Sequence, residues 1–292
     1  MLISTQTGLL DRRFGFKETL NIIKSAGFDA YDATLFAKKY FELNDIFAEG
    51  DYLETARQIR KYADSIGLFC NQAHAPFGSK QGACEKDSPM FDKIVRAMVI
   101  ASTLGAKAIV VHPLHHLKYA ENALELKQEN IRFYLDLLPY AKRLGIVILA
   151  ENMWQWDDNK DNIVPSVCSE PSEFAQYVDM INSPYFKACL DIGHVALLGG
   201  SVYDAVKTLG PRLYGLHIHD NDLSYDTHQI PFTGKVNFGE MTTALAEISY
   251  KGDITFEANE FFSNIPDEQV PTIASLLVKT GRFFKQEIQK NV

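Results

Sequence analysis

The sequence predicts a single (β/α)₈ barrel domain spanning residues 1–292. Eight short apolar runs alternate along the chain with eight longer stretches of helical periodicity. Residues of the kinds that bind metals follow most of the apolar runs, and barrel enzymes carry their active sites at the ends of their strands. The alternative, an open doubly wound sheet, would need a glycine-rich phosphate loop after the first strand, and the sequence has none there.

The strands are expected where short runs rich in Val, Ile, Leu, Phe and Ala occur. Such runs are typical of strands buried on both faces. In chain order the expected strands are residues 2–6, 30–34, 68–74, 108–112, 146–151, 186–191, 213–219 and 253–257.

The helices are expected between these runs, where apolar residues recur every three or four positions. The expected helices are residues 16–26, 51–66, 88–105, 121–144, 171–182, 202–209, 238–250 and 268–289. Several end at a glycine, as Gly27 and Gly145 show, and a new apolar run follows at once. Pro171 suits the first turn of a helix, where a missing N–H costs nothing.

Composition narrows the class of protein. The chain has 292 residues, of which 46% are hydrophobic and 23% charged, with a net charge of −8. An acidic chain without a run of Lys and Arg disfavours nucleic acid as a partner. The scattered cysteines, Cys70, Cys84, Cys168 and Cys189, suit a reducing compartment. We see no signal peptide and no membrane-spanning run, so we expect a cytoplasmic protein.

Four metal-type residues end the last four expected strands. They are Glu151, Asp191, His219 and Glu257. Neighbouring strands of a barrel end side by side, so these side chains are expected to meet at one half of the mouth. Three carboxylates there would repel each other, and a dication removes that conflict. Three carboxylates and one imidazole suit Mg, Mn, Co or Zn, so we predict one divalent ion held by these residues.

Each of these residues also has a purely structural explanation. Asp191 could cap a helix, and Glu151 and Glu257 could form ion pairs that close the barrel. His217 and His219 are two apart on one strand, so they share a face, and one of them could be a core histidine. The recurrence of the pattern at successive strand ends favours the metal site.

Further candidate ligands extend the pattern beyond this set of four. His74 and His112 follow the third and fourth expected strands, and each would bind either a substrate hydroxyl or a further ion. Asp226 and His228 lie in the long segment 220–237, and together with His194 they could hold another ion or cover the substrate. The sequence therefore allows up to three ions.

Several segments carry a resemblance to a known family. They are AEN at Glu151, LDIGH at Asp191–His194, HIHDND at His219, DTHQIPFTGK at Asp226–Lys235 and FEAN at Glu257. Over residues 68–260 the chain resembles the xylose-isomerase-like TIM-barrel superfamily, which includes sugar (phosphate) isomerases and epimerases and the endonuclease IV-type abasic-site endonucleases. The isomerase branch implies Glu151, Asp191, His219 and Glu257 as the metal ligands and His194 as a substrate contact.

The endonuclease branch implies three zinc ions. Its nine ligands would map to His74, His112, Glu151, Asp191, His194, His219, Asp226, His228 and Glu257, and all nine residue types are compatible. An endonuclease needs a basic rim, whereas this chain is acidic and offers the aromatic loop Met153-Trp154-Gln155-Trp156, which suits a sugar ring. Ketose 3-epimerases of the superfamily have an arginine six residues after the metal-binding histidine. Here Tyr225 stands six after His219, which disfavours that subgroup.

We therefore expect a divalent-metal-dependent isomerase or epimerase of carbohydrate metabolism that acts on a sugar, sugar phosphate or cyclitol. Its chemistry would be proton abstraction next to a carbonyl, through a metal-stabilised enediolate, with Glu151 and Glu257 transferring the proton. The expected substrate contacts are His74, His112, Trp154, His194, His228 and Lys235. The alternatives are an endonuclease IV-like phosphodiester hydrolase and a dehydratase of the inosose or dehydroshikimate type. The sequence leaves open whether the chain forms a homo-oligomer.

Overall fold

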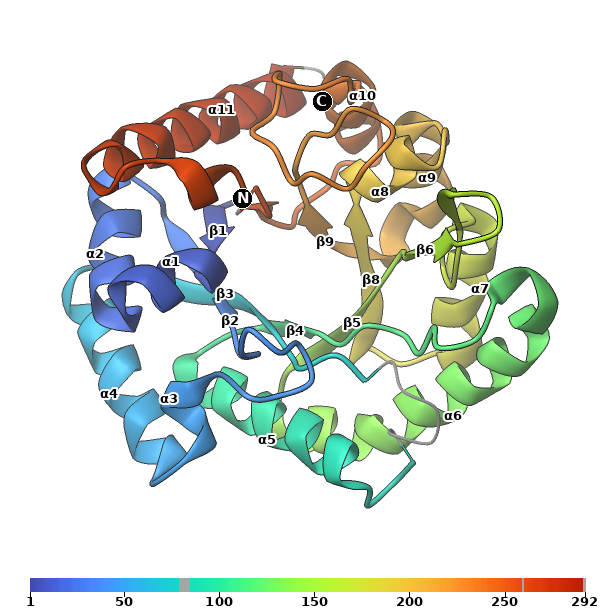
Figure 1. Ribbon diagram of the computed structural model, residues 1–292, viewed down its shortest axis with the longest axis horizontal. Helices are drawn as coiled ribbons and strands as arrows, with labels where there is room; N and C mark the ends of the chain where they lie inside the picture. The colour runs from blue at the N-terminus through green and yellow to red at the C-terminus, as the bar shows by residue number, and fades with distance from the viewer. Residues whose placement is uncertain (79–84, 259, 291–292) are drawn as a thin grey trace.

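Eight parallel strands form a closed barrel with helices around it (Figure 1). The computed structural model describes residues 1–78, 85–258 and 260–290. The strands follow each other in the order β10-β1-β2-β3-β4-β5-β8-β9. The barrel closes where the Ile218 N–H donates to the Thr255 carbonyl (3.0 Å) and the Glu257 N–H donates to the Ile218 carbonyl (3.1 Å). The predicted barrel fold is confirmed.

All eight expected strands are present, most of them slightly shorter than predicted. The barrel strands are β1 (Ile3–Gln6), β2 (Ala30–Thr34), β3 (Phe69–His74), β4 (Ala108–Val110), β5 (Val147–Glu151), β8 (Phe186–Asp191), β9 (Leu213–His217) and β10 (Ile254–Phe256). Strand β9 ends at His217, two residues before the predicted end at His219. The side chain at the end of the strand is therefore that of His217 rather than His219.

The eight expected helices are also present. They are α2 (Phe16–Ala26), α4 (Tyr52–Ser65), α5 (Pro89–Leu104), α6 (Tyr119–Leu144), α7 (Pro171–Ile181), α9 (Val202–Leu209), α10 (Phe238–Glu247) and α11 (Val270–Lys290). Gly27 and Gly105 end α2 and α5 with φ values of 100° and 97°, a left-handed backbone that suits glycine. The described residues also form three short α-helices that were not expected: α1 (Gly8–Phe14), α3 (Asp45–Ala48) and α8 (Ile192–Leu197).

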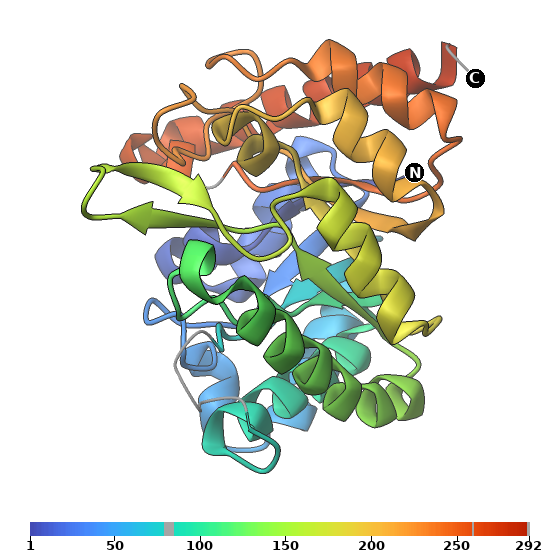
Figure 2. The same ribbon diagram turned by 90° about the vertical axis from the view of Figure 1, so that its right-hand side faces the viewer.

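A two-stranded hairpin follows β5 and stands apart from the barrel (Figure 2). Its strands are β6 (Trp154–Asp157) and β7 (Asn162–Pro165), which pair in antiparallel register. It was not expected from the sequence, in which we interpreted this segment only as an aromatic loop. The hairpin holds Trp154 and Trp156 beside the mouth of the barrel.

The barrel interior has an apolar part and a polar part. Ala108, Val110, Leu149 and Cys189 form a small buried cluster separate from the main core between sheet and helices. Fully or almost fully buried polar side chains include Gln6, Asp32, Gln72, His74 and His217. A parallel barrel usually fills its interior with branched apolar residues, so this buried polar group indicates a functional role.

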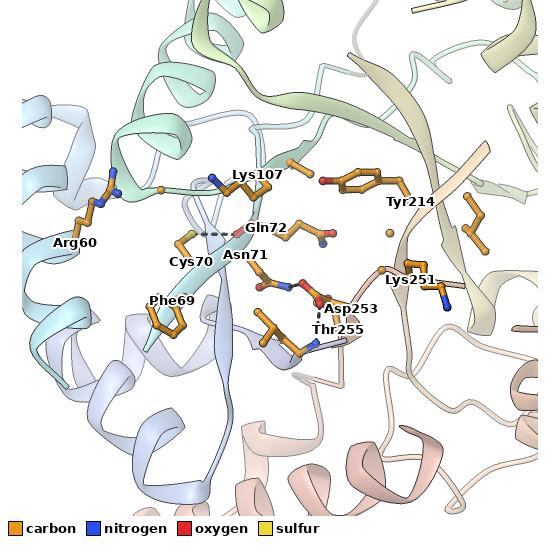
Figure 3. A pocket seen from close by; sticks show the side chains of 16 residues that line it. Arg60, Phe69, Cys70, Asn71, Gln72, Lys107, Tyr214, Lys251, Asp253 and Thr255 are labelled. Atoms are coloured by element: carbon orange, nitrogen blue, oxygen red, sulfur yellow. Dashed lines mark hydrogen bonds between the residues drawn. The ribbon is translucent and has the colours of Figure 1, made fainter. Parts of the chain in front are cut away.

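The N-terminal end of the barrel also has a cavity, of about 580 Å³ (Figure 3). Its lining includes Arg60, Phe69, Lys107, Tyr214 and Lys251. None of the site residues predicted from the sequence lines it.

No helix in the described part of the chain is long and apolar enough to cross a membrane.

The side chain of Asn44 forms hydrogen bonds with residues of α1, β2 and α3 near the mouth of the barrel. Its side-chain amide donates to Asp11 Oδ2 (3.0 Å) and to the Thr34 carbonyl (3.2 Å), and its oxygen accepts from the Ile46 N–H. Asp11 is only 8% exposed. Burial raises the pKa of Asp11 to about 7, although Arg12 and Asn44 act in the opposite direction.

We predict that Asp11→Asn stabilises the fold more at pH 8 than at pH 5. An unfolded aspartate ionises near pH 4, so above that pH the folded state holds a proton that the unfolded state releases. The contribution of Asp11 to stability therefore falls as pH rises from about 4 to about 7, by roughly 1.4 kcal/mol per pH unit. Urea unfolding should show the gain from Asp11→Asn increasing by roughly 2.5 kcal/mol between pH 5 and pH 8. An equal gain at both pH values would contradict the buried, protonated state of Asp11.

Candidate metal centre and substrate cleft

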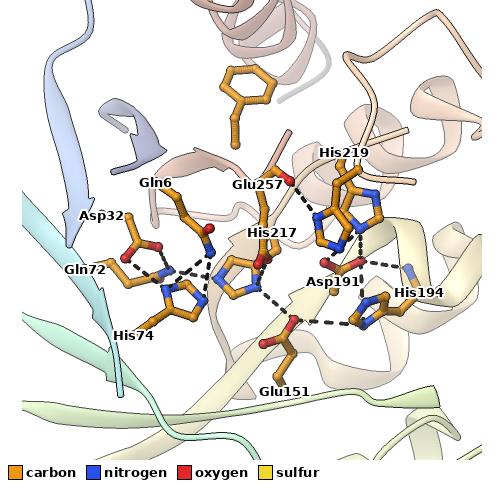
Figure 4. Close-up of polar contacts among 12 residues, drawn as sticks. Gln6, Asp32, Gln72, His74, Glu151, Asp191, His194, His217, His219 and Glu257 are labelled. Atoms are coloured by element: carbon orange, nitrogen blue, oxygen red, sulfur yellow. Dashed lines mark hydrogen bonds and ion pairs between the residues drawn. The ribbon is translucent and has the colours of Figure 1, made fainter. Parts of the chain in front are cut away.

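Four side chains converge where β5, β8, β9 and β10 end (Figure 4). Glu151, Asp191, His217 and Glu257 each offer one ligand atom, and these atoms lie within 4.8 Å of one another. His217 Nδ1 lies 2.9 Å from Glu151 Oε1 and 2.8 Å from Glu257 Oε2. We call these four residues the ion group. Three of its four members were predicted from the sequence.

The fourth member of the ion group is His217, whereas the sequence predicted His219 as the histidine ligand. Strand β9 ends at His217, so this side chain points into the carboxylate group. The His219 ring lies farther along the chain, with Nε2 3.0 Å from Asp191 Oδ1. Gly193 makes room for that ring, since a Cβ at this position would lie 2.1 Å from His219 Cε1.

His219 instead belongs to a second group of potential ligands. His194, His219, Asp226 and His228 also offer ligand atoms within 4.8 Å of one another, and we call them the histidine group. Asp226 Oδ2 lies 3.1 Å from both His194 Nε2 and His228 Nε2. Burial would lower the pKa of His228, but the Asp226 carboxylate raises it to about 10. The histidine group is therefore held together by one carboxylate between imidazoles.

The carboxylates of the ion group are kept ionised by their histidine neighbours. Burial alone would raise the pKa of Glu151, but the nearby charges of His217 and His112 and the hydrogen bond from His217 hold it well below its usual range. Burial opposes His217 in the same way at Glu257, and the pKa of Glu257 is also lowered. Both side chains therefore carry the negative charge that a cation requires.

The donor set of the ion group fits a divalent ion. Within the described residues, Glu151 Oε2 and Glu257 Oε2 are buried without a hydrogen-bond partner. Each has a histidine nitrogen nearby, at 3.0 Å from His112 Nε2 and 2.8 Å from His217 Nδ1, but neither contact has hydrogen-bond geometry. A buried carboxylate oxygen without a donor is costly, and a metal ion would satisfy it.

A third set of ligand atoms joins the ion group to the third and fourth strands. His74, His112 and Glu151 offer atoms within 4.8 Å of one another. His74 Nδ1 lies 3.0 Å from Asp32 Oδ1, and the ring is fully buried. His74 is thus placed beneath the cleft and is not among its lining residues, and its role as a substrate contact stays a prediction.

Asp32 lies behind two of these histidines. Its Oδ1 faces His74 Nδ1, and its Oδ2 accepts from Gln72 Nε2 at 2.8 Å. Gln72 Nε2 in turn lies 2.9 Å from His217 Nε2, on the side of the ring away from the ion group. Figure 4 shows this chain of polar contacts running from Asp32 to Glu151. Such outer contacts fix the orientation of a histidine ligand.

One cleft of about 880 Å³ opens over the ion group. Seven predicted site residues line it: His112, Glu151, Trp154, His194, Asp226, His228 and Glu257. Asp191, His217 and His219 are fully buried behind this surface. Lys235 is exposed and is not part of the lining, so its predicted contact with substrate is not supported. His194 uses both ring nitrogens, on the Asn152 carbonyl (2.8 Å) and on Asp226.

Several residues of the site were missed at the level of sequence. Asp32 and Gln72 stand within short strands, where a polar residue can equally face solvent. Their full burial only becomes visible once the barrel is closed. The sequence did indicate His217, because it is the last residue of the YGLH run. His219 follows only two positions later, so the pattern alone does not tell which histidine lies at the end of the strand.

A family model described as xylose isomerase-like TIM barrel matches residues 20–274. A putative L-ribulose-5-phosphate 3-epimerase of Haemophilus influenzae is 23% identical over 264 residues, which cover 85% of each chain. An uncharacterized protein of Sinorhizobium fredii is 26% identical over 161 residues. That match covers 54% of this chain and about half (49%) of the length of the relative.

Solved structures support the same fold. A D-psicose 3-epimerase from Clostridium cellulolyticum H10, solved with D-tagatose, superposes with a TM-score of 0.75. The match covers 97% of this chain and 99% of that one, at 13% sequence identity. At 13% identity this similarity shows a shared barrel fold and does not show a shared reaction.

We predict that Asp32→Asn weakens divalent metal binding by about 10- to 100-fold, the range found for outer-shell partners of metal ligands. The amide cannot accept from both His74 and Gln72 as the carboxylate does, so the ring of His74 and, through Gln72, that of His217 lose a fixed orientation. Isothermal titration of the metal-free protein with Mn²⁺ or Zn²⁺ measures the affinity directly.

Asp253→Asn is the matched control for this change. Asp253 accepts hydrogen bonds from the Leu2 N–H and from Asn71 at the opposite end of the barrel. Its substitution should leave metal affinity unchanged. An Asp32→Asn protein that binds metal as tightly as the original would show that the contacts of Asp32 do not position the ligands.

Proposed function

The chain belongs to the xylose isomerase-like TIM barrel family, and we propose that it is an isomerase or epimerase of a sugar that works with a divalent metal ion. The observation that carries this proposal is the ion group at the base of the cleft, with three carboxylates and one imidazole. The names of relatives agree with it, because they include a ribulose-phosphate epimerase and a psicose epimerase.

Glu151, Asp191, His217 and Glu257 would hold the ion, and their oxygen-rich set suits Mg, Mn, Co or Zn. A divalent ion bound there would polarise a substrate carbonyl and so acidify the neighbouring C–H. The orientation of Asp191 supports this proposal, since its side chain caps α8 by accepting from the His194 N–H at 2.7 Å.

Proton transfer falls to Glu151 and Glu257. A base must be ionised at working pH, and a divalent ion bound beside both carboxylates would keep them so. In Figure 4 the two carboxylates reach the same nitrogen of His217, Nδ1, from the ends of two different strands. Epimerisation removes a proton on one face of a carbon and returns it on the other, so a carboxylate on each side of the substrate suits that outcome. Isomerisation and dehydration share the first step and would use the same base.

One departure from the ketose 3-epimerases persists after His217 replaces His219. Counted from His217, the sixth residue is Leu223 rather than Tyr225, and neither is an arginine. The position of the epimerised carbon therefore does not follow from this motif.

A phosphodiester hydrolase is the second candidate function. The histidine group favours it, because an additional ion beside the ion group would stabilise both the attacking and the leaving oxygen. The net charge of −8 argues against a nucleic-acid substrate.

We predict that the metal-loaded protein exchanges a carbon-bound proton of a ketose or aldose with solvent. Incubation with a panel of sugars in deuterated water, with Mn, Mg, Co or Zn supplied, should give deuterium at the carbon next to the carbonyl, as detected by NMR. Glu257→Gln should lower the exchange rate by about 100-fold or more, the usual range for a lost acid–base group.

Glu247→Gln is the matched control, because this exposed glutamate contacts Tyr203 and Lys207 away from the cleft. If the Glu257→Gln protein exchanged the proton at the original rate, Glu257 would not be a proton-transfer group. Cleavage of an abasic-site duplex, without exchange into any sugar, would favour the hydrolase instead.

A further inference from the structure

The cleft offers more space than one sugar ring requires. Its volume of about 880 Å³ lies near the upper end of the roughly 300–1,000 Å³ found for sites that enclose drug-sized ligands. A monosaccharide belongs at the lower end of that range. The ion group occupies only the base of the cleft, so space remains beyond the reacting atoms.

Three aromatic rings form one side of this space. Phe36, Tyr40 and Phe77, which we call the aromatic wall, have ring centroids 5.2–5.5 Å apart. Phe77 stacks on the His112 ring at 3.9 Å, and His112 Nε2 lies 3.0 Å from Glu151 Oε2. The wall therefore begins beside the ion group and leads outward from it.

Backbone hydrogen bonds fix the wall without any ligand. The Phe77 N–H donates to the Tyr40 carbonyl (2.8 Å), and the Leu35 N–H donates to the His74 carbonyl (2.9 Å). These bonds join the segments that follow β2 and β3. Phe36 is 8% exposed, whereas Tyr40 is 51% exposed. An ordered ring with a free face can bind a partner ring at little entropic cost.

The charges around the outer cleft cancel. Outside the ion and histidine groups, the charged side chains of the lining are Arg12, Lys118, Asp158 and Glu260, two of each sign. Among the described lining residues there is no cationic cluster for a phosphate ester, which Arg and Lys side chains usually bind. The chemistry of this part of the cleft favours an uncharged group.

We propose that the substrate is a ring-extended sugar, in which the reacting unit lies at Glu151 and Glu257 and an uncharged second ring stacks on Tyr40. The inference rests on the proposed sugar chemistry and names its substrate class. The second ring is either a further sugar or an aromatic aglycone, because both present an apolar face to tyrosine. A free monosaccharide fills the reaction site and leaves the wall uncovered.

Paired substrates test this inference. D-fructose is compared with lactulose and isomaltulose, which carry a second sugar ring, and with 6-O-benzyl-D-fructose, which carries an aromatic one. The extended sugars should show a kcat/KM for proton exchange about tenfold higher, as expected for one stacked ring. The arm with the larger gain identifies the type of ring. Tyr40→Ala should lower kcat/KM about tenfold more for the extended sugars than for fructose, and Tyr40→Phe should retain the preference.

Tyr214→Ala is the control, because Tyr214 is a half-exposed tyrosine at the opposite end of the barrel. This substitution should leave kcat/KM unchanged for fructose and for the extended sugars. Saturation-transfer NMR of the bound sugars adds a readout that does not depend on turnover. Equal binding and equal rates for fructose and all extended sugars would overturn the inference. Binding of an extended sugar that depends on Tyr40, without exchange into any sugar, would overturn the proposed chemistry and leave the wall assignment standing.

Discussion

Three carboxylates meet inside a low-dielectric barrel mouth, and the positive charge that balances them determines the arrangement of the whole site. Glu151 and Glu257 both lie within 3 Å of His217 Nδ1, and Asp191 lies beside His219. A carboxylate is paired with imidazoles in the same way at Asp226, which lies between His194 and His228. Buried charges are stable only when they are paired, so each acid has an imidazole as its neighbour. A dication can take over this role in the ion group.

The barrel supplies this arrangement through strand order. β5, β8 and β9 are neighbours in the sheet, and β10 follows β9 around the barrel. Side chains at their ends therefore meet although they lie far apart in sequence. Beneath them, Asp32 and Gln72 replace the usual apolar filling and hold the rings of His74 and His217 from behind. Buried polar residues make the barrel less stable than an apolar interior would. They also fix the orientation of His74 and of His217, the histidine of the ion group.

Sequence patterns predicted the barrel, all eight strands, and Glu151, Asp191 and Glu257, because an apolar run followed by an acid is a local signal. The sequence could not place His217 rather than His219 beside the three carboxylates, since both face the same way and the run does not reveal where strand pairing stops. Asp32 and Gln72 were missed because their partners come from other strands. The aromatic wall was missed for the same reason: Phe36 and Tyr40 are brought to Phe77 only by the folded barrel.

Anomalous X-ray scattering from crystals soaked in Mn²⁺ tests the central claim most directly. The structure predicts a peak at coordinating distance, about 2.0–2.3 Å, from side-chain atoms of Glu151, Asp191, His217 and Glu257. A further peak within the histidine group would add a second ion without changing this result. An empty ion group, with manganese bound only at the histidine group or not bound at all, would contradict the assignment of these four residues as the metal centre.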